Sequence, residues 1–168
     1  MGSMDEVGFK KGIRRLWMLW GVLLFSLYLY VKICHMLDSR WEPILDNSFP
    51  IDTLKMILYI VCALLLVLSR YFRNYVLTSQ NPKNNANYLK RASKTNSNPA
   101  IIKYSTAVIC SIAIALNVGI AGFGMFLLTK DLHTLYILVA ISAIAVIYHR
   151  PKLSELESVA STMNSMKA

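Results

Sequence analysis

YSTAVICSIAIALNVGIAGFGMFLLT, residues Tyr104–Thr129, runs for 26 residues without a charged side chain. An α-helix rises about 1.5 Å per residue, so this stretch is longer than the roughly 30 Å hydrocarbon core of a bilayer. A charge-free run of this length predicts a membrane-spanning helix with room to tilt.

Three further apolar segments lie outside this stretch: Leu16–Leu37, Ile51–Phe72 and Leu132–Tyr148. The composition agrees with a membrane protein, because 55% hydrophobic and only 16% charged residues are unusual for a soluble domain. We therefore predict an all-α integral membrane protein, a four-transmembrane-helix bundle within a single membrane domain over residues 1–168. Between the second and third spans we expect a basic loop over residues 73–103, and after the fourth a tail over residues 149–168. Gln80–Asn85 and Asn96–Pro99 are expected to break helical structure in this loop, leaving a turn or two of helix between them.

The basic residues indicate how the bundle is oriented. Of the 18 Lys and Arg residues, 14 lie in the N-terminal tail, the loop between the second and third spans, or the C-terminal tail. By the positive-inside rule, both termini and the middle loop are expected in the cytoplasm. The size and charge asymmetry favour a bacterial cytoplasmic membrane.

Helix packing is predicted from the third span and its short connection to the fourth. Thr129–Asp131 leaves no room for a long loop, so the two spans should form a tight antiparallel hairpin. Small residues recur along the third span at a spacing that places them on one face and lets another helix approach closely. The predicted packing residues are Ala107, Ser111, Ala115, Gly119 and Gly122. They fit packing within the hairpin, or a seam with another copy or a partner subunit.

Asn117 is the most polar side chain in the middle of any span. Lipid cannot satisfy its amide, so we expect a buried polar residue facing protein or water. It lies about 160° around the helix from Gly119, which suggests a second buried face. An interhelical hydrogen bond and a polar position on a permeation path are both compatible with it.

Ion-coupled transport generally uses a charged group held inside the membrane, and no Asp or Glu lies deep within a predicted span. The glycine-rich hairpin resembles the ring subunit of rotary ATP synthases, and four spans in a small chain resemble the small multidrug exporters. Both families depend on a membrane-embedded carboxylate. The chain departs from both families at that residue, so we assign it to neither.

Redox chemistry has few candidate residues. Cys34, Cys62 and Cys110 are scattered over three spans without a Cys-x-x-Cys motif, so they are expected to be buried small hydrophobes. His35 and His133 lie at similar predicted depth and are the weak candidates for ligating a haem or binding a quinone. Interfacial histidines explain them equally simply, and we predict neither a cofactor nor a metal site.

The middle loop is expected to contact anionic phospholipid head groups or an acidic partner. Between Arg70 and Lys103 it carries basic residues and no acidic one, and such charges are attracted to an anionic leaflet. The contacting residues are predicted to be Arg70, Arg73, Lys83, Lys90, Arg91, Lys94 and Lys103. No stacking platform accompanies the charge, so nucleic acid is not expected.

Three functional classes remain. The first is a non-catalytic structural, accessory or assembly subunit of a membrane complex, bound to a membrane-protein partner or to copies of itself. The second is an oligomeric channel or small-solute transporter without an intramembrane carboxylate, using Asn117 and Ser111. The third is a haem- or quinone-binding redox protein using His35 and His133. The missing catalytic groups favour the first, and we predict that the protein is not an enzyme.

Overall fold

The structure is a computed structural model that describes residues 3–40, 42, 44, 50–79, 82–95 and 98–165. Within these residues the chain is all-helical, as predicted, and has six helices. They are α1 (Ser3–Asp38), α2 (Ile51–Thr78), α3 (Pro82–Thr95), α4 (Pro99–Thr129), α5 (Leu132–Tyr148) and α6 (Leu153–Ser165).

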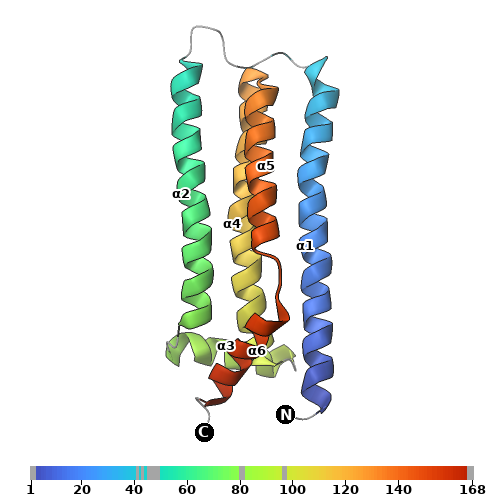
Figure 1. The fold of residues 1–168 in the computed structure, drawn as a ribbon, viewed down its shortest axis with the longest axis vertical. Coiled ribbons are helices and arrows are strands. Elements are labelled where there is room, and N and C mark those ends of the chain that lie inside the picture. Colours follow the sequence, from blue (N-terminus) through green and yellow to red (C-terminus); the bar gives the residue numbers. More distant parts are fainter. Residues whose placement is uncertain are drawn as a thin grey trace.

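Four long helices run side by side, and α4 with α5 forms the centre of the group (Figure 1). α1 packs against both α4 and α5, whereas α2 packs mainly against α4. In the most apolar 18-residue stretch of α4, half of the residues are buried in the molecule. The corresponding share is 6% in α2 and 11% in α1. The central helix is therefore the glycine-rich segment, and the flanking helices expose most of their apolar surface.

The two short helices lie at one end of this group. α3 and α6 cross beneath the long helices, at the same end as the start of α1 (Figure 1). We call this the basic end, because α3, the start of α1 and the segment after α5 carry most of the lysines and arginines. The end that holds Asp38, Asp52 and Asp131 is called the opposite end.

The helices identify a small multi-pass membrane protein. α1 from Phe9, α2 and α4 are each long and apolar enough to cross a bilayer. α5 has only 17 residues and is long and apolar enough to cross a bilayer only when it is taken together with α6. The two helices are bent by 52° relative to each other. The structure thus supports three spans, or four if α5 with α6 forms one bent span.

Residues 73–103, predicted as a loop with a turn or two of helix, are mostly helical in the described part of the chain. α2 continues six residues past its predicted end, and α4 begins five residues before its predicted start. Pro82 and Pro99, interpreted as breakers, are instead the first residues of α3 and α4. Proline suits this position, because its fixed φ is helical and its missing N–H has no partner within the helix. Asn98 caps α4 by accepting a hydrogen bond from the Ala100 N–H at 3.0 Å.

Two residues connect α4 to α5: Lys130 caps the end of α4, and Asp131 caps the start of α5. Lys130 takes a left-handed conformation with φ 57°, and its N–H donates to the Phe126 carbonyl. Asp131 then caps α5 by accepting from the N–H groups of His133 and Thr134. α5 runs back along α4, since Ser142 meets Ala115 and Leu138 meets Gly122.

Candidate functional site

The small residues of α4 face its neighbours. All five predicted packing residues are buried: Ala107, Ser111, Ala115, Gly119 and Gly122. A Cβ on Gly122 would lie 2.9 Å from the Leu138 Cβ, and one on Gly119 would lie 2.6 Å from the Leu27 Cδ2. The Ser142 hydroxyl donates to the Ala115 carbonyl at 2.9 Å. These positions therefore bring α4 close to α5 and α1 within one chain.

Asn117 lies on the other side of α4 and is exposed, so its predicted burial within the chain is wrong. Helices α1, α2 and α5 pack on the sides of α4 that hold the small residues. One amide N–H donates to the Ala113 carbonyl of the same helix at 2.8 Å. The exposed residues on this side are Ile109, Ala113, Asn117 and Ile120, which we call the outward stripe.

A buried polar cluster joins α2, α4 and the start of α6 at the basic end. Arg73 of α2 is only 7% exposed, and its guanidinium donates to the His149 carbonyl at 2.9 Å. The same guanidinium forms an ion pair with the Glu155 carboxylate of α6 at 2.6 Å. Arg73 thereby bridges the bend after α5 and the helix that follows it.

The hydrogen bonds around His149 favour one neutral tautomer. Ser69 Oγ donates to the Ser111 carbonyl at 2.8 Å and lies 2.9 Å from His149 Nε2. A hydroxyl has a single proton, so Ser69 must accept from an Nε2–H. His149 Nδ1 then presents its lone pair to the Arg73 Nη1, 3.4 Å away. A proton on Nδ1 would face the guanidinium directly.

The protonation of His149 is correspondingly difficult. It lies one residue beyond the end of α5 and is 3% exposed. Burial and the positive charges of Arg73 and Arg70 lower the pKa of His149 to about 4. The imidazole is therefore neutral near pH 7 and acts as a fixed hydrogen-bonding element.

Two further contacts hold the same end together. The Tyr104 hydroxyl of α4 donates to the Lys152 carbonyl at 2.9 Å and accepts from the Lys152 N–H at 2.6 Å. Lys103 is only 2% exposed, and its ammonium group donates to the carbonyl of Ser79, just after α2, at 2.8 Å. These contacts fix the bend between α5 and α6 and the end of α2 against α4.

For two of the seven basic residues, the prediction that they contact lipid or a partner is therefore wrong. Arg73 and Lys103 are buried, because the chain after α5 folds back under the bundle and α4 starts before Lys103. Arg70 is exposed and lies over the Tyr148 ring at 5.4 Å. Exposed basic side chains of α3 are Lys90, Arg91 and Lys94, while the Lys83 side chain lies outside the described residues.

The opposite end has a smaller polar contact. The Lys55 ammonium of α2 lies 2.6 Å from Asp131, the residue that caps α5. Burial raises the pKa of Asp131, but hydrogen bonds from Lys55 and Thr134 outweigh it and lower that pKa to about 2. The Asp131 carboxylate thus links α2 to the connection between α4 and α5.

The candidate redox residues lie on four different helices. His35 and His133 are both exposed, and His35 Nε2 lies 2.5 Å from the Tyr136 hydroxyl of α5. Cys34 and Cys62 are buried free thiols on separate helices, and Cys110 is half-buried. No group of three or more His, Cys, Asp or Glu side chains that could hold a metal occurs among the described residues.

Sequence reasoning did not single out Ser69, His149 and Glu155. Ser69 falls within the second predicted span, and His149 and Glu155 fall within the predicted C-terminal tail. A signal was present in Tyr148–Pro151, because proline requires an extended residue before it and so turns the chain at this point.

No protein-family model, curated protein or solved structure matches this chain. Its function is therefore argued from its own residues.

Proposed function

We propose that this protein is a non-catalytic accessory or assembly subunit of a membrane complex, and that it meets its partner through the outward stripe of α4. Asn117 is the observation that carries the proposal. It lies at the middle of the 26-residue charge-free run, at the depth where a bilayer holds no water.

The Asn117 amide is only partly satisfied by its own chain. A carboxamide has two N–H donors and a carbonyl acceptor, and one N–H is used by the Ala113 carbonyl. Among the residues that the structure describes, neither the remaining donor nor the acceptor has a hydrogen-bonding partner. A hydrogen bond to a helix of another chain would contribute about 0.6–2 kcal/mol in lipid. Ala113, one turn before Asn117, leaves room for that helix to approach.

The buried polar groups support a structural role for the rest of the molecule. Arg73 binds both the His149 carbonyl and the Glu155 carboxylate, and these contacts hold α6 against α2. We infer that the basic end faces the cytoplasm, in keeping with the positive-inside rule, and that the host is a bacterial cytoplasmic membrane.

Photo-crosslinking in native membranes tests the proposal. A photoreactive amino acid at Asn117 or Ile120 should give an adduct with a different membrane protein, identified by mass spectrometry. The same group at Leu64 or Val67, on the exposed surface of α2, serves as the matched control. Asn117→Leu should reduce copurification of that partner about 3- to 30-fold, the loss expected for one hydrogen bond in lipid.

An adduct with a second copy of the chain would instead support the oligomeric channel or transporter, in which the outward stripes surround a common path. Absence of any protein adduct from the stripe would contradict the accessory-subunit proposal. The third candidate, a haem or quinone protein, is less favoured, because His35 already has a hydrogen-bonding partner in Tyr136.

A further inference from the structure

A groove about 550 Å³ in volume opens between α1, α3 and α4 at the basic end. Its polar side chains include Arg15 of α1 together with Arg91 and Lys94 of α3. Three cations from helices far apart in the sequence thus converge on one opening. No acidic side chain is among the described residues that line it.

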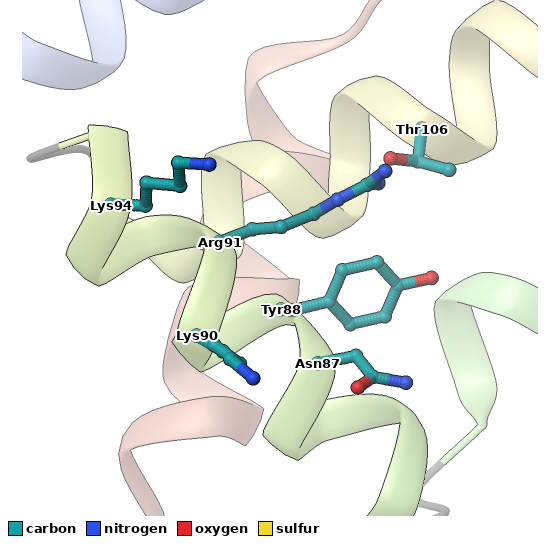
Figure 2. Close-up of a pocket in the computed structure, with 6 residues that line it drawn as sticks. All are labelled: Asn87, Tyr88, Lys90, Arg91, Lys94 and Thr106. Atoms are coloured by element: carbon teal, nitrogen blue, oxygen red, sulfur yellow. The ribbon is translucent and has the colours of Figure 1, made fainter.

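A second cavity of about 480 Å³ adjoins the first on the other side of Arg91. Arg91 and Lys94 line both cavities, and Lys90 and Tyr88 line the second. Figure 2 shows the Arg91 side chain extending from α3 toward Thr106 of α4. The surface of α3 that lines the two cavities is therefore basic on both sides of Arg91.

The groove continues from these charges along apolar walls. Leu16 and Leu19 of α1 form one side, and Ile102 and Ile109 of α4 form another. Both helices rise from the basic end (Figure 1). Ile102 and Ile109 are two turns apart, so the wall extends about 10 Å along α4, from the level of α3 toward the middle of the bundle.

The groove is cationic at the basic end and apolar toward the middle of the bundle. This pattern complements an amphiphile with an anionic head group and an apolar chain. We propose that the groove binds one anionic phospholipid, with the phosphate beside Arg91, Lys94 and Arg15 and one acyl chain along Leu19 and Ile109. A zwitterionic lipid would bring its own cation to the three basic groups. A free phosphate would leave the apolar walls uncovered.

The bound lipid would link α3 to the two spanning helices. α3 has three Asn and three Lys residues, and its main neighbour is α4. Its basic face gains about a factor of five in affinity for an anionic surface with each Lys or Arg placed there. The groove shares Ile109 with the outward stripe, but lipid binding to it does not depend on the partner proposed for Asn117.

Native mass spectrometry of the purified full chain with phosphatidylglycerol tests the site. One phosphatidylglycerol should bind per chain, more tightly than phosphatidylcholine with the same acyl chains. The double variant Arg91→Gln/Lys94→Gln should weaken phosphatidylglycerol binding about 30-fold. The matched control Arg150→Gln/Lys152→Gln removes the same charge from exposed positions outside the groove and should leave binding unchanged.

A second pair of variants tests the apolar wall with every charge retained. Ile109→Trp should obstruct the acyl chain and weaken binding at least tenfold, whereas Ile120→Trp, higher on α4 and outside the groove, should not. Equal weakening by both double variants, or no effect of Ile109→Trp, would overturn the proposal. Displacement of the lipid by millimolar inorganic phosphate or glycerol phosphate would also overturn it, since the site would then recognise an anion without an acyl chain.

Discussion

His149 occupies a site where an added proton is unfavourable. Its Nε2–H is donated to Ser69, and its Nδ1 faces Arg73, so protonation would place an N–H beside a guanidinium. The charged groups that surround it are Arg73 and Arg70 from α2 and Glu155 from α6. Only Glu155 favours the imidazolium, and its carboxylate is already paired with Arg73.

The stability of the protein should therefore fall as the pH falls from about 6.5 to about 4. In this range the unfolded chain binds a proton at His149 and the folded chain does not, so acid favours unfolding. The full effect, on the order of 3 kcal/mol, is approached near pH 4 and is absent above pH 7. Thermal unfolding in mild detergent between pH 7.5 and 4.5 measures it.

Two histidine variants separate this effect from general acid sensitivity. His149→Gln should lower stability at pH 7.5 but flatten the pH dependence, because no imidazole remains to be protonated. His133→Gln, at an exposed position, should retain the wild-type slope. Identical slopes for wild type and His149→Gln would refute the assignment. Asp131 does not interfere, since its pKa near 2 lies below the range measured.

At this scale the sequence predicts which residues are unusual better than it predicts their surroundings. Asn117 stands out by polarity alone, but which face of α4 is covered depends on where α1, α2 and α5 pack. Arg73 and Lys103 look like ordinary loop cations, because their burial depends on α6 folding back and on a helix start that no hydropathy pattern marks. Long-range contacts of this kind are not encoded in local composition.

The glycines of α4 differ in what surrounds them, so Gly122→Ala and Gly124→Ala should have opposite effects on stability. A Cβ on Gly122 would meet the Leu138 Cβ at 2.9 Å and the Leu135 carbonyl oxygen at 3.4 Å, atoms that cannot rotate away. No heavy atom of a neighbouring helix lies within 4 Å of a Cβ on Gly124. We expect Gly122→Ala to destabilise by about 1–3 kcal/mol and Gly124→Ala to stabilise by about 0.5–1 kcal/mol.

Unfolding of both variants in the same detergent measures the difference. Equal stability of the two variants would contradict the close approach of α4 and α5. Gly119→Ala should fall between them, since its nearest contact, at 2.6 Å, is the mobile end of the Leu27 side chain.

At the scale of helices, long apolar segments were predictable, whereas the ends of α1, α2 and α4 at the basic end were not. Leu132–Tyr148 matches α5 to the residue, because Asp131 caps one end and Pro151 follows the other. α2 and α4 extend beyond their apolar segments. A helix ends where its backbone hydrogen bonds stop, and this point need not coincide with the edge of the bilayer. Pro82 and Pro99 were misinterpreted for a related reason: proline disrupts a helix interior but suits a helix start.

The whole molecule depends on whether α5 crosses the membrane. Its 17 residues extend about 26 Å, slightly less than the hydrocarbon thickness, and the polar groups of Asp131 and His149 lie beyond its two ends. α5 packs along α4, which is longer, so a locally thinner bilayer or a tilted bundle accommodates both. We therefore expect four crossings, with α6 on the same side as the start of α1.

Labelling with a membrane-impermeant maleimide tests this topology. In a background with Cys34, Cys62 and Cys110 replaced by alanine, single cysteines are placed at Arg40, Lys90 and Ser158, which are all exposed. Only Arg40→Cys should react in intact cells, and all three should react after permeabilisation, because the positive-inside rule predicts that the end with 14 of the 18 basic residues lies in the cytoplasm. Reaction of Ser158→Cys together with Arg40→Cys would mean that α5 does not complete a crossing. Reaction of Lys90→Cys and Ser158→Cys without Arg40→Cys would mean that the bundle is inverted.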